Sequence, residues 1–354
     1  LRSDKASRRR GVTMIDVARE AGVSTMTVSN VINGRSQRVS DATRERVLAT
    51  IADLGYQVNV AARQLRMGRT GMVGLAVPDF ETGYYGELAD RLADRLAGHG
   101  LRLVMERTQA SRSAELDTLT APRLSAFDGF VLSVVAGDKA DLEQLRIDTP
   151  VVLIGERAVP ARFDHVLMDN VGGARAATGL LLRTGSRRIV LLGGQPSRQQ
   201  TMPALRTRGY RKAHEEAGVP LRKELIVPSP YRIEAGYATV RRLIEDKIDF
   251  DAVFALTDTT AYGALRALTE AGIRIPDDVQ VMGFDNLVSS RFSVPALSTV
   301  EPDNDGMADA ICELLVERIE HGRQGSEPVP ARVIMPEAKI IERETTRASV
   351  AAPG

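Results

Sequence analysis

The sequence predicts two kinds of fold in one chain, a small all-α head followed by a larger α/β body made of doubly wound parallel sheets. Up to about residue 57, apolar residues recur at helical spacing. From Met72 onward, short buried-strand runs alternate with amphipathic helical stretches, which is typical of parallel sheets with helices on both faces. A length of 354 residues also exceeds one ordinary hydrophobic core.

The charge is divided unevenly between these two parts. Of the 47 Lys and Arg residues, 13 lie in residues 1–70, which hold 6 of the 46 Asp and Glu residues. The head therefore carries a net charge of +7 and the remainder −6. A basic head on an acidic body indicates a polyanionic partner for the head alone. Residues 1–11 form a basic arm that is either a solvated tail or a phosphate contact.

The stretch Val12–Asn33 predicts two short helices joined by a tight turn. Thr13 can cap the first helix, Gly22 can adopt the positive φ of the turn, and Ser24 can cap the second helix. The buried side of the second helix would comprise Val28, Val31 and Ile32. Its other face is uncharged, small and rich in hydrogen-bonding groups, and comprises Thr25, Met26, Ser29, Asn30 and Asn33.

This face fits the recognition helix of a helix-turn-helix motif. Such a helix enters the major groove, where short polar side chains reach base edges and a methyl-bearing side chain contacts the thymine methyl. An ordinary αα-hairpin with a polar solvent face is the alternative.

Two further helices are predicted before the body begins. One is capped by Ser40, has an apolar stripe of Val47, Leu48, Ile51 and Leu54, and ends at Gly55. The other, Asn59–Arg66, has barely two turns and is marginal by itself. A linker of residues 67–71 follows.

In the body, eight buried strands are expected first and two more near the end. They are Met72–Val77, Leu101–Glu106, Phe130–Ser133, Val151–Ile154, Arg188–Leu192, Leu225–Val227, Ala252–Leu256, Val279–Phe284, Arg332–Met335 and Ala338–Glu342. The expected helices are Gly86–Gly98, Val171–Thr184, Leu205–Ala217, Glu234–Asp246, Thr259–Ala271 and Asp303–Glu320. The returning elements at the end would let the chain cross between lobes more than once.

The chain resembles the LacI/GalR family of bacterial transcription regulators over nearly its whole length. The most specific motif is V-T-x-x-D-V-A-x-x-A-G-V-S-x-x-T-V-S-x-V-I-N at Val12–Asn33. Other matching segments are Val39–Val47, Leu54–Leu65, Val77–Asp79, Asp169–Gly173, Arg206–Tyr210, Gly283–Asn286 and Pro295–Val300. The resemblance implies a periplasmic-binding-protein-like body of two lobes, about 72–169 with 301–328 and about 170–300 with 329–345. Outside the body, the resemblance implies a basic arm at 1–11, a helix-turn-helix domain at 12–57, a hinge helix and linker at 58–71 and a tail at 346–354.

The resemblance also implies a homodimer that binds a pseudo-palindromic operator, because the two-fold axis of the protein matches that of the DNA. By position, the base readers would be Thr25, Met26 and Asn30. Phosphate contacts would come from Ser24, Thr27, Ser29, Asn33 and Arg35. Asn30 departs from the Arg or His that is common in the family at the last base-reading position, so no relative's operator can be carried over.

Asn59–Arg66 would be the family's hinge helix, which pairs across the dimer in the minor groove, with Asn59 as its cap. Leu65 would open the central base step as an apolar wedge. The alternative places Leu65 in the core of the head. We expect this segment to be poorly helical without operator.

The resemblance further implies a small-molecule effector, a sugar or sugar derivative, in the cleft between lobes at the strand C-termini. The candidates by position are Asp79, Tyr84, Tyr85, Arg206, Tyr231, Thr257, Asp258 and Asp285. Among them, Arg206 and Asp285 are the favoured pair, and a surface salt bridge is the alternative. Asp258 is more expected as a helix N-cap than as a ligand contact, and Tyr210 as a packing residue. Effector binding would change the angle between lobes and so operator affinity; whether it releases DNA or promotes binding does not follow.

Three rival classes of function compete with a ligand-controlled DNA-binding regulator. No nucleotide-binding or hydrolase motif occurs, and the four His residues lack metal-ligand spacing, so no catalytic residue, metal or cofactor is expected. A cytosolic sugar-binding protein, or an enzyme that acts on a sugar or nucleoside, would use the same cleft. A transport solute-binding protein is opposed by the basic head, and a DNA binder without ligand is the third rival. One Cys excludes an internal disulfide, no apolar run is long enough for a membrane span, and a cytoplasmic protein is expected.

Overall fold

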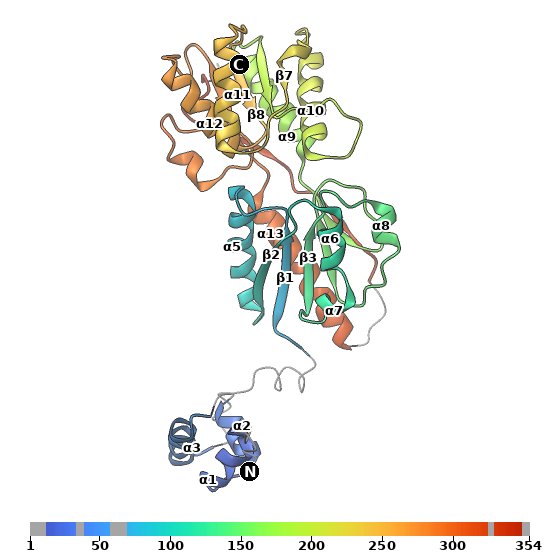
Figure 1. Cartoon of the computed structure of the whole chain (residues 1–354), viewed down its shortest axis with the longest axis vertical. Coiled ribbons are helices and arrows are strands. Elements are labelled where there is room, and N and C mark those ends of the chain that lie inside the picture. Colours follow the sequence, from blue (N-terminus) through green and yellow to red (C-terminus); the bar gives the residue numbers. More distant parts are fainter. Residues whose placement is uncertain (1–11, 33–38, 57–68, 325–328, 349–354) are drawn as a thin grey trace, which may run out of the picture. The chain divides into compact units, whose positions relative to one another are not determined.

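The computed structural model describes residues 12–32, 39–56, 69–324 and 329–348 (Figure 1). Contacts divide the chain into two compact units, Leu1–Thr70 and Gly71–Gly354, which are called the head and the body below. The body begins at Gly71, whose amide donates to Asp128 Oδ2 at 3.0 Å, whereas we expected Gly71 to be the last residue of the linker.

The described head consists of the three helices α1 (Met14–Glu20), α2 (Thr25–Ile32) and α3 (Asp41–Leu54). Thr13 and Asp16 form a capping box at the start of α1, and Gly22 adopts a φ of +63° in the turn before α2. Gly55 ends α3 in the left-handed conformation. These predictions are confirmed. The core comprises Val17, Ala18, Ala21, Val28, Val31 and Val47.

One residue of the apolar stripe expected on α3, Leu48, does not face the core of the head. Leu48 is 49% exposed, whereas Val47 is fully buried. Each residue advances about 100° around a helix, so the neighbour of a fully buried residue readily falls outside a narrow contact stripe.

The body contains two parallel sheets with helices on both faces, which confirms the predicted fold class. The lobe 1 sheet has the order β11-β5-β4-β3-β1-β2. Its strands are β1 (Met72–Val77), β2 (Arg102–Arg107), β3 (Gly129–Ser133), β4 (Val151–Ile154), β5 (Asp164–Val166) and β11 (Val333–Ile334). The lobe 2 sheet has the order β7-β6-β8-β9, with β6 (Ile189–Leu192), β7 (Ile226–Val227), β8 (Ala252–Ala255) and β9 (Gln280–Met282).

Alternation along the strands supplies apolar side chains to both faces of the lobe 1 sheet. Val73, Leu75 and Val77 of β1 belong to the core that also holds α5 (Gly83–Gly98) and α13 (Asn304–Gln324). Ala76 belongs to the core on the opposite face, under α6 (Arg112–Thr118), α7 (Ala121–Leu124) and α8 (Lys139–Glu143). We did not predict α6, α7, α8 or β5, because such short elements carry too few residues to establish a period.

Lobe 2 follows the same plan. One face of its sheet packs on α9 (Asn170–Arg183) and α10 (Met202–Glu216), and the other on α11 (Ile233–Glu245) and α12 (Asp258–Glu270) (Figure 1). Tyr210 is fully buried and donates its hydroxyl to Ile189 O at 2.8 Å, which confirms its packing role. Cys312, in α13, is also buried, as expected for a packing residue.

The chain passes between the lobes three times. It leaves lobe 1 between β5 and α9, returns through β10 (Thr299–Glu301) into α13, and leaves again through β12 (Lys339–Ile341), which pairs antiparallel with β10. The prediction that all of residues 329–345 belong to lobe 2 is wrong, because β11 pairs with β5 in the lobe 1 sheet. The expected tail also begins too early, because Thr346 is buried and Arg347 N donates to Gln280 Oε1 at 2.8 Å.

Candidate DNA-reading face and effector site

The first turn of α2 presents side chains without formal charge. Met26 is 69% exposed and Thr25 is also exposed, whereas Ser29 and Asn30 are half-buried. No acidic or basic residue occurs anywhere in α2. A helix start with an exposed, uncharged surface suits contact with base edges in a major groove.

Local hydrogen bonds hold the start of α2. Ser24 Oγ accepts from Thr27 N at 3.1 Å, and the two hydroxyls lie 2.9 Å apart. Ser24 therefore caps the helix, as predicted from the sequence. Four predicted DNA contacts, Asn33, Arg35, Asn59 and Leu65, lie outside the described residues, as do the basic arm and the proposed hinge helix.

In the body, the structure brings Arg206 and Asp285 together in a buried pair. Arg206 Nη2 lies 3.5 Å from Asp285 Oδ1, and the two side chains are 3% and 7% exposed. The surface-salt-bridge alternative is therefore wrong. Burial raises the pKa of Asp285 to about 7, against the lowering effect of Arg206.

Each nitrogen of the Arg206 guanidinium has a partner within the protein. Nε donates to Asn170 Oδ1 at 2.7 Å, Nη1 donates to Leu256 O, and Nη2 lies 3.1 Å from Met168 Sδ. The guanidinium carbon also lies 3.4 Å from the centroid of the Phe284 ring. These contacts within the protein therefore set the orientation of the Arg206 side chain.

Tyr84 and Tyr85, at the start of α5, approach this pair from lobe 1. Their rings meet edge to face, with centroids 5.2 Å apart. Burial raises the pKa of both hydroxyls, and the nearby Asp285 raises the pKa of each further. The Tyr85 and Ser133 hydroxyls lie 3.2 Å apart.

Sequence reasoning missed Glu156 and Asn170. Asn170 Nδ2 donates to Glu156 Oε1 at 2.9 Å, so these residues extend the Arg206 network into lobe 1. Glu156 also raises the pKa of Tyr84, Tyr85 and Asp285. Both residues carried a usable signal, because Glu156 comes shortly after strand β4 and Asn170 belongs to the motif at Asp169–Gly173.

Three predicted effector residues, Asp79, Thr257 and Asp258, accept hydrogen bonds from backbone amides. Asp79 Oδ1 accepts from Glu81 N at 3.0 Å and from Thr82 N at 2.8 Å, which shapes the loop before α5. Thr257, rather than Asp258, is the N-cap of α12. The expected capping role of Asp258 is therefore wrong, because its carboxylate is fully buried and accepts from Leu287 N at 2.8 Å and Thr299 Oγ1 at 2.5 Å.

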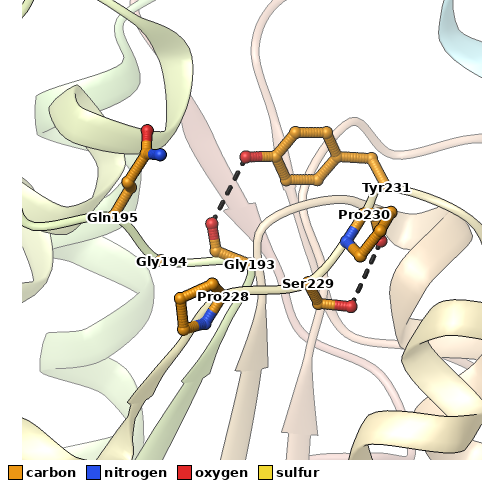
Figure 2. Close-up of a pocket in the computed structure, with 7 residues that line it drawn as sticks. All are labelled: Gly193, Gly194, Gln195, Pro228, Ser229, Pro230 and Tyr231. Atoms are coloured by element: carbon orange, nitrogen blue, oxygen red, sulfur yellow. Dashed lines mark hydrogen bonds between the residues drawn. The ribbon is translucent and has the colours of Figure 1, made fainter.

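Tyr231 lines a cavity of about 270 Å³ at the ends of β6 and β7 (Figure 2). Its hydroxyl donates to Gly193 O at 3.3 Å across the cavity, and burial raises its pKa to about 12, against the lowering effect of Arg206. The other lining residues are also uncharged: Gly193, Gly194, Gln195, Pro228, Ser229 and Pro230. In the described part of the chain, no group of three or more His, Cys, Asp or Glu residues could hold a metal ion.

Family models match both parts of the chain. The model described as "Bacterial regulatory proteins, lacI family" matches residues 13–59, and the model described as "Periplasmic binding protein-like domain" matches residues 178–346. The transcriptional repressor PurR of Mannheimia succiniciproducens is 32% identical over 334 residues, which cover 93% of this chain and 99% of that protein. The chain belongs to the LacI family. Its relatives are named as DNA-binding transcriptional regulators and repressors, not enzymes.

Solved structures of LacI-family relatives have the same fold. A LacI-family regulator from Sanguibacter keddieii is 37% identical, with a TM-score of 0.72 over 79% of this chain and all of that chain. The complex of the regulator CelR with cellobiose is 30% identical, with a TM-score of 0.65 over 94% of this chain and 99% of that chain. Within the described residues of our LacI-family chain, no helix is long and apolar enough to cross a membrane.

Proposed function

We propose that this LacI-family protein is a homodimeric repressor whose affinity for a pseudo-palindromic operator is controlled by an uncharged, polyhydroxylated ligand. The carrying observation is the buried Arg206–Asp285 pair, whose Asp285 carboxylate acts electrostatically on two buried tyrosines of the other lobe, in a chain whose head matches a DNA-binding family. A carboxylate accepts from neighbouring hydroxyls, and tyrosine rings pack against a sugar ring.

In the head, Thr25, Met26 and Asn30 are the proposed base readers. The exposure of the first two supports this assignment. Ser24, Thr27 and Ser29 would hold phosphates, together with Asn33 and Arg35. Asn59 and Leu65 would belong to a hinge helix in the minor groove.

In the body, the proposed ligand contacts are Tyr84, Tyr85, Arg206, Tyr231 and Asp285, with Thr257 at their margin. Asp79 and Asp258 position the loops around them through the backbone contacts described above. Both lobes contribute, so a bound ligand would favour one angle between them and thereby alter how the paired heads meet DNA.

The charges around Arg206 favour an uncharged ligand. Asp285 lies beside this guanidinium, Glu156 is one hydrogen-bonded residue away, and Glu301 also raises the pKa of Asp285. Because Arg206 already has partners at all three nitrogens, a phosphate or carboxylate would meet more carboxylates than available cations. The cellobiose bound by CelR is a neutral sugar of the expected class.

DNA recognition can be tested by selecting duplexes from a random pool with the full chain. We expect enrichment of a two-fold symmetric sequence, with affinity falling steeply as salt rises. Asn30→Ala should lose about 1–3 kcal/mol of discrimination, whereas Arg175→Ala, a control on α9 in the body, should bind normally. A pool without an enriched sequence would refute the proposed repressor.

Ligand class can be tested by the thermal midpoint of the body with matched sugars. D-ribose, D-glucose, D-galactose and cellobiose are the neutral probes, and glucuronate, galacturonate and glucose 6-phosphate are the anionic ones. A ligand at 100 times its Kd stabilises the folded state by about 2.7 kcal/mol, so one neutral probe should raise the midpoint. A larger rise with an anionic probe would contradict the charge argument, and no rise with any probe would contradict the sugar effector.

A further inference from the structure

The turn that carries Asp285 has an unusual backbone. Asp285 has a φ of +113° and Asn286 a φ of +49°, and residues other than glycine rarely adopt such values. A conformation of this kind persists only where the surroundings determine it. The groups that hold this turn therefore decide where the Asp285 carboxylate points.

Most of the hydrogen bonds that hold the turn come from the segment that leads back into lobe 1. Asp285 N donates to Val300 O at 2.9 Å, and Asn304 Nδ2 donates to Asp285 O at 2.8 Å. Asn286 N donates to Thr299 Oγ1 at 3.3 Å. The turn is thus attached to β10 and to the first residue of α13.

Glu301 joins these contacts through both of its carboxylate oxygens. Oε2 accepts from Asn286 Nδ2 at 2.6 Å, and Oε1 accepts from Asn304 N at 2.7 Å. The other end of the Asn286 amide, Oδ1, accepts from Arg343 Nη2 at 2.6 Å, just beyond β12. Two segments that cross between the lobes therefore meet at Asn286.

We infer that Glu301 is a positioning residue that fixes the Asp285 turn to the crossover into lobe 1. A ligand that displaces Asp285 would then also displace the start of α13, because the hydrogen bonds of Asn286 and Glu301 connect the two. This inference rests on the proposed function, because it takes Asp285 as a ligand contact. The role of Glu301 is to hold and transmit, without touching the ligand.

The test compares Glu301→Gln with Glu342→Gln, which removes the same charge from an exposed residue beside β12. In Glu301→Gln an NH2 group replaces one carboxylate oxygen. This NH2 group then faces one of the two donors, Asn286 Nδ2 or Asn304 N, and that hydrogen bond is lost. We expect affinity for the neutral sugar probe to fall roughly tenfold, the effect of losing one charge-assisted hydrogen bond. Glu342→Gln should change it less than twofold.

The double variant Asn286→Asp with Glu301→Gln reverses donor and acceptor at this contact while Arg343 can still donate to residue 286. We expect it to recover sugar affinity to within about threefold of the unmodified chain, because both hydrogen bonds re-form. A general loss of folding would not be rescued in this way. Failure of the double variant to recover affinity would overturn the inference.

Amide hydrogen exchange over residues 285–287 supplies a readout that needs no ligand. Exchange should be faster in Glu301→Gln than in the unmodified chain, and unchanged in Glu342→Gln. In the double variant it should return to the rate of the unmodified chain. If no sugar binds the unmodified chain, the proposed effector fails while exchange still tests the positioning role. Equal exchange in Glu301→Gln and Glu342→Gln would overturn that role.

Discussion

Met26 in the head is 69% exposed, whereas Arg206 in the body is 2% exposed, although both are proposed to contact a ligand. The first lies on a helix whose start is held by hydrogen bonds between residues three apart. The second depends on partners at Met168, Asn170, Leu256 and Asp285, which are 36 to 79 positions away in the sequence.

Because of this difference, a substitution on the reading face of the head can change binding without changing stability, whereas a substitution at the buried pair in the body changes both. An exposed side chain can be exchanged without removing packing, so its variants report on binding alone. A buried charge exists in the fold only with its partners, so its variants also change folding. The predictions below test this contrast, beginning with the largest expected effect.

Arg206→Ala should lower the free energy of unfolding of the body by about 3–5 kcal/mol. The substitution leaves the buried Asp285 without its cation and removes the contacts with Asn170 and Phe284. Urea unfolding followed by circular dichroism measures the change. The control Arg175→Ala, which breaks an exposed pair with Glu216, should stay within about 0.5 kcal/mol. Similar losses for both variants would remove the distinction between buried and exposed charges.

The pKa of Asp285 near 7 predicts a pH dependence of stability. Because burial raises this pKa above its unfolded value, the folded state binds more protons, and stability is lost as pH rises from about 4 to about 7. Between pH 5.5 and 7.5 this carboxyl should contribute a loss of about 2 kcal/mol.

Comparison with Asp285→Asn tests that contribution against the buried Asp258, whose pKa is also raised by burial and which titrates in both proteins. His165 and His214 have pKa values lowered by burial, so they contribute in the opposite direction in both proteins. Urea unfolding at the two pH values should show a steeper fall for the unmodified chain than for Asp285→Asn. Parallel pH profiles would mean that Asp285 keeps an ordinary pKa.

Ser24→Ala should destabilise α2 by about 1 kcal/mol, because it removes the oxygen that caps Thr27 N. Met26→Ala, two residues away, should leave α2 unchanged within about 0.5 kcal/mol. Hydrogen exchange of the α2 amides in the full chain measures both effects. Faster exchange in Met26→Ala than in Ser24→Ala would mean that Met26 stabilises α2, and would contradict its assignment as an exposed residue that serves DNA reading rather than stability.

The sequence alone determined the features that depend on near neighbours. These are the caps at Thr13, Ser24 and Ser40, the left-handed Gly22 and Gly55, and the division into an α head and an α/β body. Helix caps and glycine turns are set by residues within one turn of chain, and strand–helix alternation is visible as a change of period.

Only the tertiary structure decided which partners the effector candidates have within the protein. Position in the sequence suggested both Asp258 and Asp285, but Asp258 holds Leu287 N and Thr299, while Asp285 pairs with Arg206. The sequence also gave no indication that Glu301 would meet Asn286, or that β11 would join the lobe 1 sheet. These outcomes depend on contacts between residues far apart in the chain, for which a single sequence contains no local signal.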